Sequence, residues 1–433
     1  MEHALIRRDV RMIDDPMRAK SRALLSGCAL AAIGVAGCAI LAFVRPQQAL
    51  GDAPIIMVRE SGALYVRIGD TLHPAMNLVS ARLIVGSPAT PEVVKESELR
   101  KAKRGALLGI PGAPDVLPEP IAASESRWAV CDDATTGTTV IAGSRPAGGV
   151  VTLNDGRAVL AHPRGEAVTY LLYDGVRARV SRAEPSVARA LHLEAAEPRE
   201  LSPALLNAIP EVPPITAPPI HNAGDRGPDP IGLPVGSVVR VTRADGDELF
   251  VILTGGAQRV GRVAADIIRF SNSVGARDIV TVTADAIAAT PSLQTLPVAT
   301  FPDSAVRPID EAVVCAQWAP DDGAVAAFGT PVVPVDPAGA AVRMAQADGM
   351  GPNVDAVFVP PGRCLFVQSP QRYIVSDTGV RFGVGAESAA ALGLSQSPVP
   401  APWSFVKLLV DGPELTREAS LVAHDGAAAI PLR

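Results

Sequence analysis

The sequence is poor in the residue types by which binding to nucleic acid or sugar is usually recognised. Only 4% of its 433 residues are aromatic, and lysine and arginine form no extended stripe beyond the N-terminal region. The first 22 residues carry a net charge of +2, which leaves −8 for the remainder. Because a polyanion partner needs a cationic stripe that releases counterions from phosphates, this distribution argues against nucleic acid as a partner.

Sequence signatures of catalysis are also missing. The chain contains no GxxxxGK[ST] phosphate loop, no HExxH or HxxxH metal spacing and no GxSxG nucleophile elbow. The turn Gly383-Val384-Gly385 resembles a dinucleotide turn, but Ser388 stands where that fingerprint has a third small residue. We therefore predict a strand-to-helix turn there, and assign no catalytic, metal-binding or cofactor-binding residue.

One long apolar run is present near the N-terminus. Ala23 to Val44 is 22 residues without a charge, enough at ~1.5 Å per residue to cross a hydrocarbon core of about 30 Å. The basic residues precede it, so the positive-inside rule places the N-terminus in the cytoplasm and the bulk of the chain outside. A cleaved signal or a lipoprotein signal at Cys28 or Cys38 is the alternative, but the apolar run continues through Phe43, which favours a retained anchor.

Beyond the anchor, the chain repeats itself. Four segments each read as an apolar strand, a tight turn, a second strand and a stretch with helical spacing. Turns such as Asp174-Gly175 and Gly255-Gly256 supply the positive φ that a hairpin needs. The segments begin near Leu64, Tyr170, Leu249 and Tyr373. A hairpin packed on a helix is the predicted unit.

The repeats are arranged in two halves. Trp128-Ala-Val-Cys131 and Ala312-Val-Val-Cys315 mark equivalent positions, since the two cysteines lie 184 residues apart and Leu64 lies 185 residues before Leu249. The spacing then grows, which predicts an insertion around residues 320–355. The β-rich stretches of both halves are expected to form one common sheet. Its predicted strands are 138–143, 149–153, 158–162, 324–328, 340–344 and 357–359.

These patterns predict an α+β fold with a single N-terminal transmembrane helix and four small α+β repeats around a central β-sheet domain, duplicated with quasi-two-fold symmetry. The predicted order is a cytoplasmic head (1–22), the transmembrane helix (23–44), the first repeat (45–120), the first part of the central domain (121–166), the second repeat (167–210), a proline-rich linker (211–231), the third repeat (232–295), the second part of the central domain (296–370), the fourth repeat (371–418) and a C-terminal tail (419–433).

The five cysteines fall into two sets. Cys28 and Cys38 lie inside the apolar run, where they behave as small hydrophobic residues. Cys131, Cys315 and Cys364 lie beyond it, where an oxidising space would allow a disulfide. The duplicated positions favour a Cys131–Cys315 bridge that joins the two halves, while three buried free thiols are the alternative. The state of Cys364 is left open.

Glu2 to Pro16, together with the apolar run, resembles the EccB component of type VII (ESX) secretion systems. The resemblance continues through 62–85, 109–119, 128–132 and 170–181 and more loosely to Trp403. It implies a structural core subunit of the secretion translocon, with a cytoplasmic N-terminus, one transmembrane helix and an elongated periplasmic region. The head residues expected to take part in assembly are Arg7, Arg8, Arg11, Asp14, Asp15 and Pro16.

The resemblance also implies partners. These are the translocon subunits EccC, EccD and EccE, further copies of the chain bound through the periplasmic repeats, and a mycosin protease. Family members usually carry further cytoplasmic sequence before the residues that match Arg7 and Arg8.

Two other functions stay open. Family members are often labelled ATPases, which implies ATP as a ligand, and the only pointers to such a site are Gly383 to Ser388 and the turn near Arg177. A module that binds the cell envelope is the other, although such sites usually have more aromatic residues than this chain.

Overall fold

The computed structural model describes residues 16–44, 51–100, 102–143, 149–244, 246–271, 278–335, 339–349 and 351–425. It divides into two compact units. The first contains the described residues up to Ala75 together with Ala89–Leu107, and the second contains Met76–Pro88 and the described chain from Leu108 onward.

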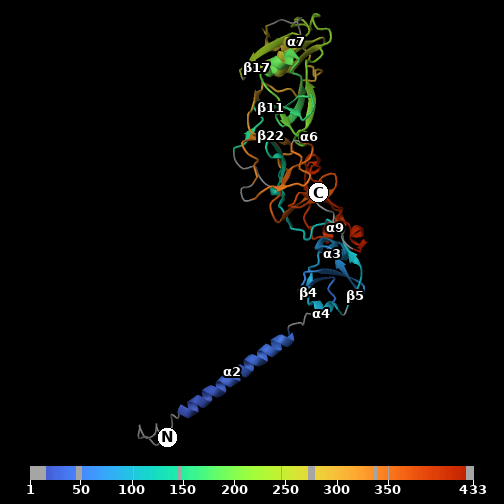
Figure 1. The fold of residues 1–433 in the computed structure, drawn as a ribbon. Coiled ribbons are helices and arrows are strands. Elements are labelled where there is room, and N and C mark those ends of the chain that lie inside the picture. The colour runs from blue at the N-terminus through green and yellow to red at the C-terminus, as the bar shows by residue number, and fades with distance from the viewer. Residues whose placement is uncertain are drawn as a thin grey trace, which may run out of the picture. The chain divides into compact units, whose positions relative to one another are not determined.

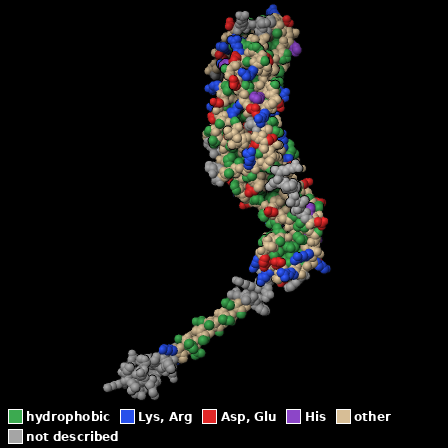
Figure 2. Space-filling view, in the orientation of Figure 1, with side chains coloured by type: hydrophobic (Ala, Val, Ile, Leu, Met, Phe, Trp, Pro, Cys, Tyr) green, Lys and Arg blue, Asp and Glu red, His purple; other side chains and the backbone are tan. Residues whose placement is uncertain are grey.

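The first unit begins with a long helix, α2 (Pro16–Val44), drawn in blue in Figure 1. Its stretch Lys20–Ile40 is long and apolar enough to cross a membrane. Large side chains such as Leu25 and Ile33 are about 70% exposed along it, and Figure 2 shows the helix covered mainly by hydrophobic side chains with Lys or Arg at its start. A long helix with apolar side chains on all sides is typical of a membrane span. The helix also takes in the last residues of the predicted head.

The rest of the first unit is a small sheet. β1 (Ile55–Val58), β2 (Leu64–Ile68) and β3 (Thr71–Ala75) form an antiparallel meander. A parallel strand flanks it on each side, β4 (Glu92–Val94) beside β1 and β5 (Lys103–Arg104) beside β3. The short helix α4 (Glu96–Leu99) adds Leu99 to the core formed by Ile56, Val58, Leu72 and Val94.

The second unit contains three more sheets built on a three-stranded meander. One sheet has β14 (Arg199–Leu201), β11 (Arg157–Pro163), β12 (Tyr170–Tyr173), β13 (Val176–Val180) and β15 (Glu211–Ile215). Another has β19 (Val280–Thr281), β16 (Val238–Arg243), β17 (Gly246–Leu253) and β18 (Gly256–Val260). A third has β28 (Val399–Pro400), β25 (Arg363–Gln368), β26 (Arg372–Val375), β27 (Val380–Gly383) and β29 (Val410–Asp411). Two of these meanders have a parallel strand on each side, and the meander of β16, β17 and β18 has one beside β16 only.

Helices follow the meanders and pack in pairs. α5 (Pro185–Leu191) lies against α7 (Arg262–Ser271), and α3 (Leu78–Val85) lies against α9 (Ala386–Ala391) and α11 (Arg417–Ser420), as Figure 1 shows for α3 and α9. α3 therefore belongs to the second unit, and the expectation that residues 45–120 form one self-contained repeat needs correction. The shorter helices are α6 (Pro203–Ala208), α8 (Ala284–Ala288) and α10 (Trp403–Val406).

The centre of the second unit is a seven-stranded sheet built from both halves of the chain. Its order is β10 (Val151–Thr152), β22 (Val325–Thr330), β21 (Val313–Trp318), β8 (Trp128–Asp133), β9 (Gly137–Ala142), β24 (Ala356–Phe358) and β23 (Val342–Arg343). The predicted common sheet is therefore confirmed. One predicted member was wrong, because residues 158–162 lie in β11, which forms a hairpin with β12 instead.

The two halves exchange strands. β10 of the first half pairs with β22 of the second, and β24 of the second pairs with β9 of the first. Likewise β20 (Arg307–Pro308) lies beside β11, and β7 (Glu119–Pro120) lies beside β25. The Arg363 guanidinium reinforces the last pair by donating to the carbonyls of Glu119 and Pro120, each at 3.2 Å. Each half thus completes the sheets of the other.

The predicted linker also needs correction at its start. Residues 211–215 form β15, which pairs with β13, and Ile215 is fully buried. Pro213 and Pro214 are tolerated because β15 is an edge strand, where a missing N–H breaks no ladder. Similarly β25 precedes the predicted start of the fourth repeat at residue 371, yet it pairs with β26.

Gly175 lies in the turn between β12 and β13. It sets how closely the sheet that contains these strands, called the second-repeat sheet, approaches the central sheet. Gly175 has φ of +77°, and a Cβ there would collide with the carbonyl oxygen of Val325. Gly165 has a similar φ of +74° but open space around it. We predict that Gly175→Ala lowers the free energy of unfolding by roughly 2–4 kcal/mol, and Gly165→Ala by about 1–2 kcal/mol. Urea unfolding of both variants tests this, and equal losses would contradict the close approach.

Candidate functional site

The candidate site is the seam where β8 and β21 pair at the middle of the central sheet. Cys131 and Cys315 lie directly opposite each other, with Cα atoms 4.0 Å apart, and the structure joins them by a disulfide. Both are fully buried, in a cluster that includes Ile141, Phe328 and Phe358. This is the pairing that the duplicated positions favoured, and its formation in the cell stays a prediction.

A buried carboxylate lies next to the bridge. Asp132 is 1% exposed and accepts hydrogen bonds from the hydroxyls of Thr138 and Ser202, both at 2.8 Å, and from the Ser202 amide at 2.6 Å. Ser202 in turn caps α6 by accepting from the Leu205 amide. Burial raises the pKa of Asp132, and the hydrogen bonds from Ser202 and Thr138 work against that rise. The carboxylate therefore fastens α6 to the central sheet.

An arginine on β14 makes a second connection to the seam. The Arg199 guanidinium donates to the carbonyls of Glu311 at 2.6 Å and Ala312 at 2.8 Å, which directly precede β21. Burial lowers the pKa of Arg199, while the carboxylates of Asp310, Asp132 and Asp133 raise it. The second-repeat sheet is thus held by charged groups to strands of both halves.

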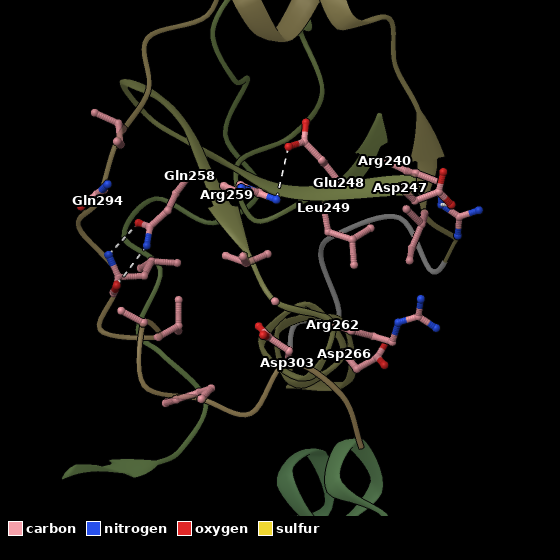
Figure 3. Close-up of a pocket in the computed structure, with 18 of the residues that line it drawn as sticks. Arg240, Asp247, Glu248, Leu249, Gln258, Arg259, Arg262, Asp266, Gln294 and Asp303 are labelled. Atoms are coloured by element: carbon pink, nitrogen blue, oxygen red, sulfur yellow. Dashed lines mark hydrogen bonds and ion pairs between the residues drawn. The ribbon is translucent and has the colours of Figure 1, made fainter. Parts of the chain in front are cut away.

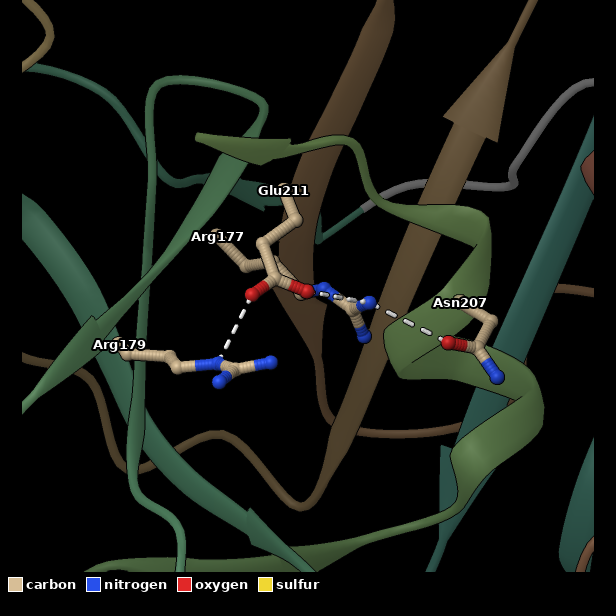
Figure 4. Close-up of polar contacts among 4 residues, drawn as sticks. All are labelled: Arg177, Arg179, Asn207 and Glu211. Atoms are coloured by element: carbon tan, nitrogen blue, oxygen red, sulfur yellow. Dashed lines mark hydrogen bonds and ion pairs between the residues drawn. The ribbon is translucent and has the colours of Figure 1, made fainter. Parts of the chain in front are cut away.

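The turn near Arg177 is occupied by contacts within the fold. Arg177 lies over the Tyr170 ring at 4.9 Å and donates to Glu211 at 3.0 Å and Asn207 at 3.2 Å. Arg179 pairs with the other oxygen of Glu211 at 2.9 Å, so the carboxylate lies between two guanidinium groups (Figure 4). These contacts hold β15 against β13.

The sheet that contains β25, β26 and β27, called the fourth-repeat sheet, also has an arginine that lies over aromatic rings and pairs with an acid of the flanking strand. Arg381 lies over the rings of Tyr373 and Trp403, at 5.5 and 4.8 Å, and pairs with Asp411 of β29 at 3.4 Å. The nearby segment that resembled a dinucleotide turn runs from Gly383, the last residue of β27, into α9, with Gly385 as the N-cap. It is a strand-to-helix turn, as the sequence predicted.

The predicted assembly residues lie elsewhere. Arg7, Arg8, Arg11, Asp14 and Asp15 lie outside the described residues, and Pro16 is the first residue of α2. Asp132 and Arg199 were missed from sequence, because nothing in a single acid or arginine shows that it will be buried against a distant strand. Within the described ranges, no group of three or more His, Cys, Asp or Glu side chains is placed to hold a metal.

The comparisons with known proteins cover nearly the whole chain. The family model described as "Type VII secretion system ESX-1, transport TM domain B" matches residues 1–429. The chain belongs to the EccB family.

Two curated relatives of this EccB chain show the range of similarity. The ESX-3 secretion system ATPase EccB3 of Mycolicibacterium smegmatis is 39% identical over 98% of this chain and 88% of that protein. The ESX-1 secretion system ATPase EccB1 of Mycobacterium tuberculosis is 33% identical over 100% of this chain and 93% of that protein.

Solved structures match as well. A chain of the intact ESX-5 inner membrane complex has a TM-score of 0.79 and 32% identity, and the match covers 99% of this chain and 93% of that one. A chain of the EccB3 dimer from the ESX-3 core complex has a TM-score of 0.75 and 35% identity over 86% of this chain and 100% of that one. With the apolar helix α2, this family membership makes the chain a single-pass membrane protein.

The raised pKa of Asp132 predicts a pH dependence. The carboxyl group of Asp132 holds its proton more tightly in the folded protein than in the unfolded chain. It therefore stabilises the fold at pH values below its ordinary pKa of 3.8, and this stabilisation is lost as the pH rises through the pKa of the folded state. Urea unfolding at a series of pH values should show that Asp132→Asn, though less stable overall, lacks this decline.

The neighbour Asp133 serves as the control. Partial burial works against its charge, but hydrogen bonds from Thr135 and Thr136 outweigh this and lower its pKa. Asp133→Asn should therefore remove a contribution to the free energy of unfolding with the opposite pH dependence. That contribution is present above pH 3.8 and is lost as the pH falls. The same slope in both variants would contradict the assignment.

For the bridge, we predict that mass mapping under non-reducing conditions finds a Cys131–Cys315 peptide with Cys364 free. Cys364 should alkylate slowly in the folded state, because burial raises its pKa to about 12. Replacing both Cys131 and Cys315 by Ala should lower the free energy of unfolding by about 2–5 kcal/mol, measured by urea unfolding. Finding both residues as free thiols would disprove the bridge.

Proposed function

We propose that this chain is a structural core subunit of a type VII (ESX) inner membrane complex, in which α2 anchors the subunit and the repeats form a scaffold for protein export. The observation that carries this proposal is the match over 99% of the chain, at a TM-score of 0.79, to a chain of the ESX-5 inner membrane complex. The exposed apolar surface of α2 supports the anchoring role.

We further propose that the N-terminus is cytoplasmic and the repeats are periplasmic. Lys20 and Arg22 lie at the start of the apolar stretch, which agrees with the positive-inside rule. The buried Cys131–Cys315 pair supports the same orientation, because a disulfide between strands persists in an oxidising compartment.

The proposed partners are the translocon subunits EccC, EccD and EccE, which would bind the head around Arg7, Arg8, Arg11, Asp14, Asp15 and Pro16, and the membrane helix. Self-association through the repeats is proposed too, supported by the EccB3 dimer among the similar structures. A mycosin protease is a further candidate on the periplasmic side.

A scaffold explains the described side chains better than a nucleotide hydrolase does. The curated relatives carry the name ATPase. In this chain the two pointers to such a site make contacts within the fold, Arg177 with Glu211 and Gly383 with Leu415, whose amide donates to the Gly383 carbonyl at 2.8 Å. ATP is therefore left out of the proposed role.

Deleting residues 1–44 tests the proposal. The second unit has its own extensive core, so we expect a soluble protein that unfolds cooperatively but no longer enters the membrane complex. Blue native electrophoresis of gently extracted membranes measures the second effect. A matched variant that keeps α2 but changes Arg7, Arg8 and Arg11 to Ala separates anchoring from recognition by the head. A complex of unchanged size and composition after the deletion would overturn the proposal.

A further inference from the structure

The sheet formed by β16, β17 and β18 lacks the last strand that the related sheets have. Parallel strands β5, β15 and β29 run beside the third meander strand in the other three sheets. Beside β18 this strand is reduced to a single bridge between Ala257 and Ser292. The final edge of this sheet is therefore open beyond residue 257.

The hydrogen-bond pattern shows which groups face this edge. Ala257 donates to the Pro291 carbonyl at 2.8 Å and accepts from the Leu293 amide at 2.9 Å, so its backbone points away from β17. Alternate residues of a strand face the same way, and Arg259 is therefore the next residue with its N–H and C=O directed outward. Along the described chain, β18 has no strand partner at Arg259 besides Phe250 of β17.

The equivalent positions in the other sheets are protected. Each is the residue opposite the aromatic of the middle strand, Tyr65, Tyr170, Phe250 or Tyr373. Pro74 has no N–H to offer, Gly383 accepts from the Leu415 amide, and Arg179 lies between Ala178 and Val180, which both pair with β15. Among these four positions, Arg259 alone presents an open backbone donor and acceptor.

A glutamine of β18 binds the neighbouring segment through its side chain. The Gln258 side chain accepts from the amides of Thr295 and Leu296 and donates to the Leu296 carbonyl, at 2.8 to 3.0 Å. The counterparts of Gln258 are Ala178 and Phe382, whose side chains have no hydrogen-bonding group. Parallel strands pair with these two meanders at Ala178 and at Arg381. A cavity with a volume of about 890 Å³ lies beside this glutamine, and Figure 3 shows Gln258 and Gln294 on one side of it and Arg262 and Asp266 on the other.

The charges at the edge indicate what kind of segment fits. The strands that cover the equivalent edges each bring an acid to an arginine, Glu211 to Arg179 and Asp411 to Arg381. Both have prolines close behind the acid, at Pro213 and Pro413. The Arg259 side chain is 71% exposed, and its one ion pair among the described residues is with Glu248 at 3.3 Å, which also binds Arg243. Arg262 lies at the same rim with no ion pair in the described part of the chain.

We propose that the open edge of β18 binds an extended segment of a partner protein, with an acidic residue followed closely by proline, which pairs with the backbone of Arg259 and enters the cavity. The partner adds a parallel strand, as β15 and β29 do within the chain, and its acid pairs with Arg259 or Arg262. The proposal stands independently of the role in secretion, because it uses only groups of this sheet.

The test uses the full chain in detergent and a labelled peptide, Ile-Pro-Glu-Val-Pro-Pro-Ile-Thr-Ala, which copies residues 209–217. Fluorescence anisotropy should show saturable binding, and hydrogen exchange should slow at residues 259–262. Arg259→Glu should weaken binding by about tenfold or more, because it places like charges together. Arg259→Pro, which copies Pro74, should remove the slowed exchange. The matched control is Arg343→Glu on the exposed edge strand β23, which should bind as the wild type does.

Several results would overturn the proposal. Equal binding by the wild type and Arg259→Glu, absence of saturable binding, or protection confined to other edges would each do so. An equal loss of peptide binding in Arg343→Glu would mean that the peptide responds to the net charge of the protein and not to the edge of β18. A change of oligomeric state in Arg259→Glu without peptide would assign the edge to a second copy of the chain instead.

Discussion

The second unit depends on the antiparallel pairing of β8 with β21. In this register the bridge cysteines face each other, and Trp128 lies opposite Trp318. Since β10, β24, β7 and β20 each pair across the halves, sliding β8 against β21 would break ladders in three sheets together. A one-residue slip would also turn the buried side chains of the slipped strand to the opposite face. The seam therefore fixes the arrangement of the sheets on both sides of it.

Buried charges at the seam add specificity. Asp132 and Arg199 both lie where removal from water costs energy, and each is compensated by directed hydrogen bonds, to Ser202 and Thr138 in one case and to two carbonyls in the other. Such groups tolerate few alternative partners, whereas the apolar residues around them would pack in several ways. We infer that they select one placement of the second-repeat sheet, while the apolar core supplies most of the stability.

The features that sequence predicted are those that short segments encode. The apolar run, the glycine-containing turns and the two Cys landmarks are local, and they led to the membrane helix, the hairpins and the common sheet. The features that it missed are long-range. Residues 119–120 and 363–368 carry no local signal that they pair, and 158–162 has the same alternation whichever sheet it joins. The prolines of 211–215 suggested a linker, although an edge strand tolerates the same residues.

The sheet formed by β16, β17 and β18 shows how a duplicated scaffold can differ at one position without losing its fold. An alanine or phenylalanine side chain makes no hydrogen bonds with a neighbouring segment, so the backbone of that segment needs a direct backbone partner. Parallel strands supply it in the other sheets, at Ala178 of β13 and at Arg381 of β27. Gln258 instead satisfies the backbone of Thr295 and Leu296 through its own amide. The segment thus keeps its hydrogen bonds through a side chain, and the open edge falls at a solvent-exposed arginine, where water can hydrate the backbone. A polar side chain at this one position accompanies an open edge, while the three-stranded meander of the sheet is preserved.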